Sequence, residues 1–63
     1  MKEFLIKVRK EKGLSQKDVA EAAEMNQAAY SNIEKGKRNP SVKTAKKIAA
    51  VLGFDWIEFF KES

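Results

Sequence analysis

The sequence predicts an all-α fold, a bundle of five short helices in a single domain over residues 1–63. Apolar residues recur at intervals of three and four in successive segments, which is the spacing of residues along one face of a helix. The three glycines and the one proline fall only between these segments. Ser15, Asn26 and Ser41 directly precede three of the segments, and their side chains can accept hydrogen bonds from the free N–H groups of a helix start.

The first predicted helix covers residues 2–12 and carries Phe4, Leu5 and Val8 on its apolar side. Ile6 lies on the opposite side of this helix. Two interpretations of Ile6 fit the sequence, a single exposed aliphatic side chain or a contact with a partner.

Residues 16–23 and 27–35 form two predicted helices joined by only three residues, and helices joined so tightly must cross steeply. The second of them turns Tyr30 and Ile33 to the core. We expect the Tyr30 ring to pack inside and its hydroxyl group to reach the surface. The opposite edge of this helix is then free to protrude.

The fourth predicted helix starts behind Ser41 and ends at Gly53, and the fifth opens at Asp55 with Glu58 placed for a capping box. A chain of this length buries only about 60% of the surface of its unfolded form, so a dimer partner would add stability. The expected core stripe of the fourth helix consists of Val42, Ala45, Ile48, Ala49 and Leu52.

The outer edge of the predicted helix 27–35 is small and rich in amides, with Gln27, Ala28, Ser31 and Asn32. Gln and Asn side chains can pair with the N6/N7 edge of adenine, and an alanine methyl can lie against a thymine methyl. A merely solvated helix face would carry more Glu and Lys than this one does. The pattern therefore indicates a surface that reads base edges in the major groove of DNA.

Positive charge is concentrated directly behind this helix. The net charge is +4, and residues 35–47 hold six cations and no acid. Such a basic stripe beside an amide-rich helix is typical of phosphate binding, where the cations set affinity and register. For Lys46 and Lys47 the alternative is the solvated side of a helix. The expected phosphate contacts from this stretch are Lys35, Lys37, Arg38, Lys43 and Thr44.

Composition excludes several classes of function. The chain has no Cys and no His, so it lacks disulfides, the usual zinc ligand sets, and Ser/His or Cys/His catalytic groups. We expect no enzyme activity, no cofactor and no metal; a buried Lys–acid pair with a shifted pKa would reopen the enzyme hypothesis. No apolar run approaches the roughly 20 residues that span a bilayer, which predicts a soluble cytoplasmic protein without membrane contact.

The stretch GLSQKDVAEAAEMNQAAYSNIEKGKRNPS resembles the signature of the Cro/phage-repressor (XRE-type) helix-turn-helix family, and the similarity runs from about Leu5 to Phe60. The resemblance implies a lambda-repressor-like DNA-binding domain of bacterial or phage origin, acting on nucleoid DNA. It also implies that the base readers are the four outer-edge residues of helix 27–35 named above.

Further roles follow from the same resemblance. Gln16 and Lys17 stand where similar proteins contact a phosphate, and Arg9 matches the family's arginine that pairs with the glutamate found here as Glu34. At Glu24 the chain departs from the family, which usually has Gly at this turn. A left-handed backbone at Glu24 would cost roughly 1 kcal/mol.

The C-terminal segment is apolar around most of its circumference, through Trp56, Ile57, Phe59 and Phe60. The family pattern accounts for most of these as closure of the core but not for Ile57. A surface of this kind marks a partner site, and in many similar proteins this end forms a two-fold dimer. We expect a homodimer interface at Trp56, Ile57 and Phe60; the alternative is a monomer with an unusually apolar end.

The combined interpretation is a sequence-specific transcriptional regulator, a repressor, that binds double-stranded DNA at a roughly palindromic operator as a homodimer. The recognition helix 27–35 of each protomer would enter one major groove. The alternative is an antitoxin-like or adaptor protein whose main role is to bind a different protein partner through its C-terminal helix.

Overall fold

The computed structural model describes residues 2–61 of the chain, and within them it is entirely helical. This confirms the predicted fold class. Bounds of the first four helices lie within one residue of the predicted ones. The helices are α1 (Glu3–Glu11), α2 (Gln16–Ala22), α3 (Gln27–Glu34), α4 (Val42–Leu52) and α5 (Glu58–Lys61).

Side-chain caps fix three of the helix starts, as the sequence predicts. At α2 the Ser15 hydroxyl oxygen accepts from the Asp18 N–H at 3.0 Å, and the Asp18 carboxylate accepts from the Ser15 N–H at 3.0 Å. These hydrogen bonds, first the one from the Ser15 backbone, lower the pKa of Asp18. The Asn26 carboxamide oxygen caps α3 at 2.7 Å, and the Ser41 hydroxyl caps α4 at 3.2 Å. Each cap satisfies a donor that the helix leaves free.

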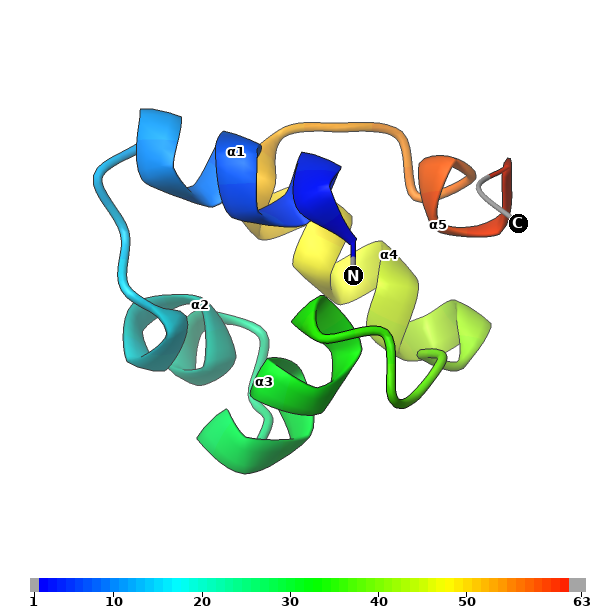
Figure 1. The fold of residues 1–63 in the computed structure, drawn as a ribbon, viewed down its shortest axis with the longest axis horizontal. Helices are drawn as coiled ribbons and strands as arrows, with labels where there is room; N and C mark the ends of the chain where they lie inside the picture. Colours follow the sequence, from blue (N-terminus) through cyan, green and yellow to red (C-terminus); the bar gives the residue numbers. More distant parts are fainter. Residues whose placement is uncertain (1, 62–63) are drawn as a thin grey trace.

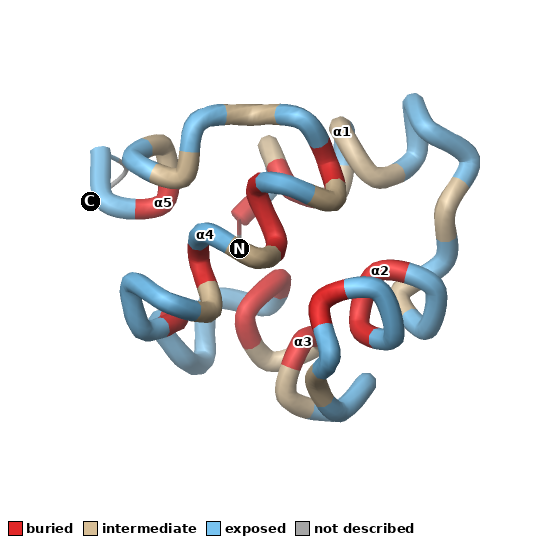
Figure 2. Tube along the Cα trace, turned by 180° about the vertical axis from the view of Figure 1, so that it is seen from behind, coloured by how far each residue is buried: buried red, intermediate tan, exposed pale blue. Residues whose placement is uncertain are grey.

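Helix α4 passes through the middle of the molecule (Figure 1). In this view α1 lies along one side of it and α2 and α3 along the other, with α5 at one end. Figure 2 shows that the buried segments of these helices face the interior and the exposed ones line the outside. The buried apolar side chains are Leu5, Val19, Ala20, Ala23, Tyr30, Ile33, Ala45, Ile48, Ala49, Leu52 and Phe59.

An aromatic cluster joins the two ends of the chain. The ring of Phe4 in α1 lies 5.4 Å from that of Phe54 and 5.7 Å from that of Phe59, both in edge-on geometry. Edge-to-face pairs of this kind contribute about 0.5–1.5 kcal/mol beyond the area they bury. The cluster therefore holds α5 and the segment before it against α1.

Glu24 occupies the turn between α2 and α3 with φ at 59°, the left-handed conformation expected at this position. It is the one non-glycine residue of the described chain with a positive φ. The Met25 N–H donates to the Ala20 carbonyl at 2.8 Å and closes the turn. The Glu24 carboxylate accepts from the Lys47 ammonium group at 3.1 Å, so an exposed ion pair ties the turn to α4.

The prediction for the last helix is wrong at its start. Helix α5 begins at Glu58, three residues after Asp55. The Asp55 carboxylate accepts from the Ile57 N–H at 3.1 Å, and the Glu58 N–H donates to the Asp55 carbonyl at 2.9 Å. Asp55 thus organises a turn and no capping box forms, because Phe54 and Trp56 are drawn against the core on either side of it.

Val42 does not belong to the core stripe, contrary to the prediction. Its side chain is 49% exposed. Val42 is the first residue of α4, and at this end of the helix Pro40 is buried in its place. Ile6, for which an exposed position was one of two interpretations, is half-buried in α1. None of the helices described is long and apolar enough to cross a membrane.

Candidate nucleic-acid interface

Helix α3 separates its residues into an inward and an outward set. Tyr30, Ile33 and Glu34 are buried with at most 3% exposure. On the other side Gln27 and Ala28, two of the predicted base readers, are exposed. The other two, Ser31 and Asn32, are half-buried one turn further on. Within residues 2–61, the side chains of Gln27, Ser31 and Asn32 form no hydrogen bond with the protein, so their polar groups remain available to a ligand.

The position of α3 depends on a hydrogen-bond network around the Glu34 carboxylate. Arg9 in α1 donates from Nε to Glu34 Oε2 at 2.6 Å and from Nη2 to Oε1 at 3.3 Å. This is the ion pair expected between these residues. The third Arg9 contact, from Nη1 to the Leu14 carbonyl at 2.9 Å, anchors the loop before α2.

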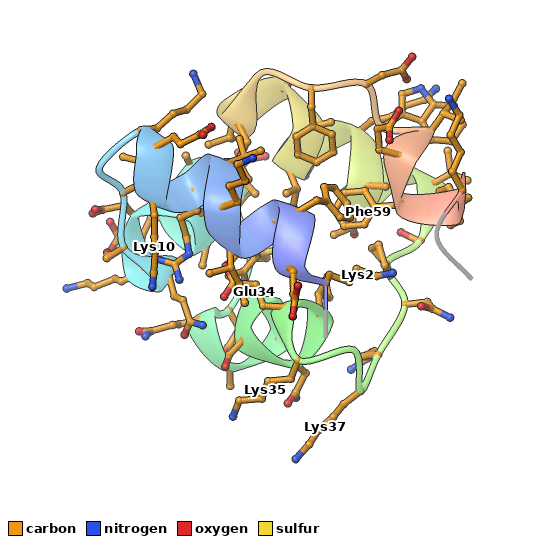
Figure 3. All side chains as sticks on the ribbon, turned by 45° about the horizontal axis from the view of Figure 1, so that its top comes forward. Lys2, Lys10, Glu34, Lys35, Lys37 and Phe59 are labelled. Carbon is orange, nitrogen blue, oxygen red and sulfur yellow. The ribbon has the colours of Figure 1, made fainter. Side chains whose placement is uncertain are left out.

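Two more donors complete the network. The Tyr30 hydroxyl donates to Glu34 Oε2 at 2.7 Å, and the Gln16 side-chain nitrogen donates to Glu34 Oε1 at 2.9 Å. An ionised carboxylate has about four acceptor sites, and here all are used. The backbone of Glu34 is engaged as well, since its carbonyl accepts from the Lys2 N–H at 2.9 Å. Figure 3 shows Glu34 beneath α1, at the centre of these elements.

The network fixes the charge of its members. Burial acts to raise the pKa of Glu34, but the hydrogen bonds from Arg9, Tyr30 and Gln16 outweigh it and hold this pKa below its usual value. The hydrogen bond to Glu34 likewise raises the pKa of Arg9. Burial, reinforced by the hydrogen bond to Glu34, raises the pKa of Tyr30. Glu34 is therefore ionised and Tyr30 neutral at physiological pH.

The expectation that the Tyr30 hydroxyl reaches the surface is wrong. Tyr30 is completely buried. Its hydroxyl turns along α3 to Glu34, one helical turn away, because the carboxylate offers a charged acceptor inside the protein. The i, i+4 spacing of the two residues is the sequence signal that could have revealed this contact.

Most of the predicted phosphate contacts are exposed cations. Lys17, Lys35, Lys37, Arg38 and Lys43 all reach solvent. Lys35 and Lys37 extend away from the body of the protein at the end of α3 and in the loop that follows (Figure 3). Ion pairs in the described part of the chain involve none of these five. Their charge is therefore free to attract an anionic partner.

The loop after α3 and the start of α4 meet at a groove. Arg38 and Thr44, both predicted phosphate contacts, line it together with Asn39, while Ala29 lines it from α3. The Ser41 hydroxyl donates to the Thr44 hydroxyl oxygen at 3.1 Å, which leaves the Thr44 proton free to donate. The positive end of the α4 dipole adds to the cations here.

Lys46 and Lys47 lie outside this groove and have contacts within the protein. Lys47 pairs with Glu24. The Lys46 ammonium group lies 5.2 Å from the centre of the Trp56 ring, a cation–π contact. Lys46 is exposed and Lys47 is half-buried.

The predicted dimer residues form an apolar face around α5. Ile57 is 44% and Phe60 49% exposed, whereas Trp56 is half-buried and packs against the core. The rings of Trp56 and Phe60 are 5.9 Å apart in edge-on geometry. In this face Trp56 is therefore held against the core, whereas Ile57 and Phe60 are exposed to solvent.

Sequence reasoning placed Gln16 at a phosphate but missed its contact with Glu34. That contact joins residues from α2 and α3, so only the tertiary arrangement reveals it. Asn39, which lines the groove beside Arg38, was also not singled out. Nothing in its local sequence distinguishes it from an ordinary loop residue.

Comparisons with known proteins agree with this geometry. A helix-turn-helix family model matches residues 5–59. The chain is 50% identical over 62 residues to an uncharacterized HTH-type transcriptional regulator, YqaF of Bacillus subtilis. The aligned residues make up 98% of this chain and 82% of YqaF. This chain is also 44% identical over 59 residues to the control protein C.MunI of a Mycoplasma species. Those residues make up 92% of this chain and 80% of C.MunI.

A third relative is longer. The HTH-type transcriptional regulator PuuR of Escherichia coli is 38% identical over 58 residues, which are 92% of this chain but only 31% of PuuR. No solved structure gave a significant match.

Proposed function

The chain belongs to the Cro/C1-type helix-turn-helix family of DNA-binding transcriptional regulators, and on that premise we propose that it represses transcription by binding a roughly palindromic operator as a homodimer in the cytoplasm. The observation that carries this proposal is the division of α3, whose inner residues are fastened by the Glu34 network while Gln27 and Ala28 remain exposed. A rigid helix with free polar side chains suits base recognition, because little order has to be gained on binding.

Sequence preference would come from the outer edge of α3. Gln27 and Asn32 each carry an amide that can donate and accept at one base edge, and Ala28 offers a methyl contact. Ser31 lies between Ala28 and Asn32 in the chain, and its hydroxyl group can form a hydrogen bond with more than one type of base. Ser31 and Asn32 are half-buried. This suits side chains that each reach a single base at the side of the DNA major groove.

Affinity and register would come from the exposed cations. Lys35, Lys37, Arg38 and Lys43 carry no ion pair within the described residues, so phosphates can replace their counterions. The Thr44 hydroxyl sits in the same groove as Arg38 and can donate to a phosphate oxygen. Lys17 would contribute from the start of α2.

Dimerisation would use the exposed side chains of Ile57 and Phe60. Ile57 and Phe60 expose apolar surface that costs free energy in water. A two-fold axis through this face would present two α3 helices to successive major grooves, about 34 Å apart along the duplex. Trp56 would support the interface from the core side.

The test is selection of bound sequences from a pool of random duplexes at near-physiological salt, so that non-specific phosphate attraction does not hide preference. We expect a two-fold motif with half-sites about 10 base pairs apart. Recovery of nothing enriched would overturn the proposal. It would favour instead the second candidate, an adaptor that binds another protein through the exposed Ile57 and Phe60 side chains.

A further inference from the structure

Met25, in the turn between α2 and α3, has both the core and a solvent-filled groove beside it. Its backbone N–H closes the turn by donating to the Ala20 carbonyl at 2.8 Å. Its side chain is half-buried and packs against the buried apolar residues. The same side chain lines the groove between α3 and the start of α4, next to Ala29 and Ile33. Met25 therefore belongs to the core and borders a space that small molecules can enter.

The thioether of Met25 is the group that a peroxide oxidises most readily in the described part of the chain. The sequence has no Cys and two Met, and Met1 lies outside the described residues. The groove has a volume of about 490 Å³, well above the roughly 30 Å³ share of one water molecule. A hydroperoxide can therefore reach Met25 without local unfolding.

Oxidation would change the polarity of the groove wall. The hydroperoxide transfers one oxygen atom to the sulfur: the O–O bond breaks, an S–O bond forms, and the leaving oxygen takes up the proton to give water or an alcohol. The sulfur loses two electrons, and the peroxide gains them. The product, methionine sulfoxide, replaces an apolar side chain by a polar one, and its oxygen accepts hydrogen bonds.

Hydrogen-bond donors line the same groove. Arg38 is exposed and has no ion pair with the described residues. The Thr44 hydroxyl group has a proton free to donate. Both residues line the groove together with Met25. A sulfoxide oxygen on Met25 would offer these donors an acceptor within the protein, in a region where residues 35–47 supply no acid.

We propose that Met25 is a peroxide-sensitive modification site and that its sulfoxide weakens DNA binding by engaging Arg38 and Thr44, two residues expected to hold phosphates. The inference rests on the proposed DNA binding and adds a means of regulating it. The fold is retained in this mechanism, because the new oxygen meets donors in the groove and is not forced into the core. Enzymatic reduction of the sulfoxide restores the thioether and with it DNA binding.

The first experiment follows oxidation of the free protein and needs no DNA. The full chain is treated with hydrogen peroxide, and peptide mass spectrometry measures the sulfoxide of Met25. We expect Met25 to react at a rate within roughly tenfold of that of free methionine in the same solution, because susceptibility follows exposure. A Met25 side chain that stays reduced until the protein melts would overturn the proposal.

Circular dichroism of the oxidised protein checks that the fold survives. The helical signal should match that of the reduced protein. Loss of this signal would mean that the sulfoxide unfolds the domain, and the proposed engagement of Arg38 and Thr44 would then be wrong.

The second experiment measures affinity for a duplex recovered by the selection described above. Oxidised wild type should bind it roughly ten- to a hundredfold more weakly per half-site, the range for a lost hydrogen bond to a charged group. The salt slope should fall by about 1, because Arg38 no longer neutralises a phosphate. Treatment with a methionine sulfoxide reductase should restore both values. Weaker binding with an unchanged salt slope would contradict the engagement of Arg38.

Met25→Leu is the matched control. Leucine keeps an apolar side chain of similar volume and cannot form a sulfoxide. The variant, which retains Met1, should bind the duplex like reduced wild type both before and after peroxide treatment. If treated Met25→Leu loses affinity as oxidised wild type does, the responsible oxidation lies elsewhere in the chain and Met25 is not the site.

Arg38→Ala separates the engagement of Arg38 from general damage. This variant lacks the donor whose engagement weakens binding, so oxidation should lower its remaining affinity by a much smaller factor than in wild type. An equal factor in both proteins would mean that the sulfoxide acts without Arg38, which refutes the mechanism.

The proposal and its premise fail in different ways. If the pool yields no enriched duplex, the proposed function fails whatever the oxidation of Met25 shows. If a duplex is enriched but oxidised wild type binds it as tightly as the reduced protein does, the function stands and regulation through Met25 is refuted.

Discussion

At the scale of single residues, Glu34 determines how α3 is held. The chain buries an ionised carboxylate in a very small core, which is tolerable only because four hydrogen bonds replace its hydration. Its partners come from α1, α2 and α3. Loss of the Arg9 or the Gln16 donor would therefore loosen α3 against α1 or α2, whereas Tyr30 donates within α3.

Tyr30→Phe tests the neutral donor of this network. The substitution keeps the buried ring and removes the hydroxyl group from Glu34 Oε2. We expect the free energy of unfolding to fall by about 1.5–3 kcal/mol, the range for a hydrogen bond to a charged group. Urea denaturation measures it. Ser31→Ala, at the next position of α3, is the control: the Ser31 hydroxyl group has no hydrogen bond with the described residues, so this variant should stay near wild type.

Acid should destabilise the protein through Glu34. The folded-state pKa of Glu34 lies below its usual value of 4.5, so its ionisation contributes stability that is fully present above that value and is lost as the pH falls through the folded-state pKa. We expect the melting temperature to drop as the pH is lowered below 4.5. Asp18, whose pKa is also lowered, acts in the same direction, so Asp18→Asn is the control that must retain most of the drop. A flat profile would contradict the assignment.

Base reading and phosphate binding separate at the residue scale too. Gln27→Ala should relax sequence preference by about 1–3 kcal/mol at one base position, because a bidentate pair is lost. Arg38→Ala should weaken all sequences alike and lower the salt slope by about 1. For both variants, selection of bound duplexes measures the sequence preference, and titration of the affinity against salt concentration measures the salt slope. Unchanged preference in Gln27→Ala would remove α3 from base recognition.

The Arg9–Glu34 pair could be predicted from the family pattern, and only the i, i+4 spacing pointed to the Tyr30–Glu34 contact, whereas nothing in the sequence revealed the contact of Gln16 with Glu34. The pattern records which residue types recur, but it does not say where a hydroxyl or amide turns once the helices are packed. Val42 illustrates the same limit. Its spacing fits the core stripe, yet its place in the first turn of α4 leaves it 49% exposed.

At the scale of elements, the turn between α2 and α3 sets how far the outer edge of α3 protrudes. Capping residues and spacing predicted α1 to α4 within one residue of their bounds. They failed for α5, because four residues give too short a pattern and the Asp55 turn depends on where Phe54 and Trp56 pack. Short C-terminal helices are decided by tertiary contacts rather than by propensity.

Glu24→Gly tests strain in the α2–α3 turn. Glu24 has φ at 59°, which costs an L-residue roughly 1 kcal/mol and glycine almost nothing. We expect Glu24→Gly to stabilise the fold by up to about 1 kcal/mol, even though the exposed ion pair with Lys47 is lost, since such pairs contribute little. Glu24→Ala loses the same ion pair and keeps the strain, so thermal melting should show it at or below wild type. Equal stability of the two variants would mean that the turn is unstrained.

At the scale of the whole molecule, the apolar side chains at the α5 end of the protein are only partly buried. The aromatic cluster of Phe4, Phe54 and Phe59 closes the core, while Ile57 and Phe60 extend beyond it into solvent. A domain of this size gains stability from any partner that covers such a face. The small core and the exposed apolar face are the two properties on which the proposed homodimer rests.

Ile57→Lys tests the dimer. The residue is 44% exposed and absent from the core, so the variant should fold with a melting temperature close to that of dilute wild type. We expect its mass in solution to fall to that of a monomer and its operator affinity to fall with it. Sedimentation equilibrium measures the mass, and Val42→Lys, an exposed apolar residue on α4, serves as the matched surface control. An unchanged mass for Ile57→Lys would remove this face from the interface.

The two sides of α3 have a consequence for how such a protein can change. The side chains that fasten the helix, Tyr30, Ile33 and Glu34, share no position with the exposed Gln27 and Ala28. Mutations at the outer positions can therefore accumulate without eroding the fold, which is a condition for evolving new targets from one scaffold. A library restricted to Gln27 and Ala28 should yield regulators of altered specificity that all melt near the parent temperature.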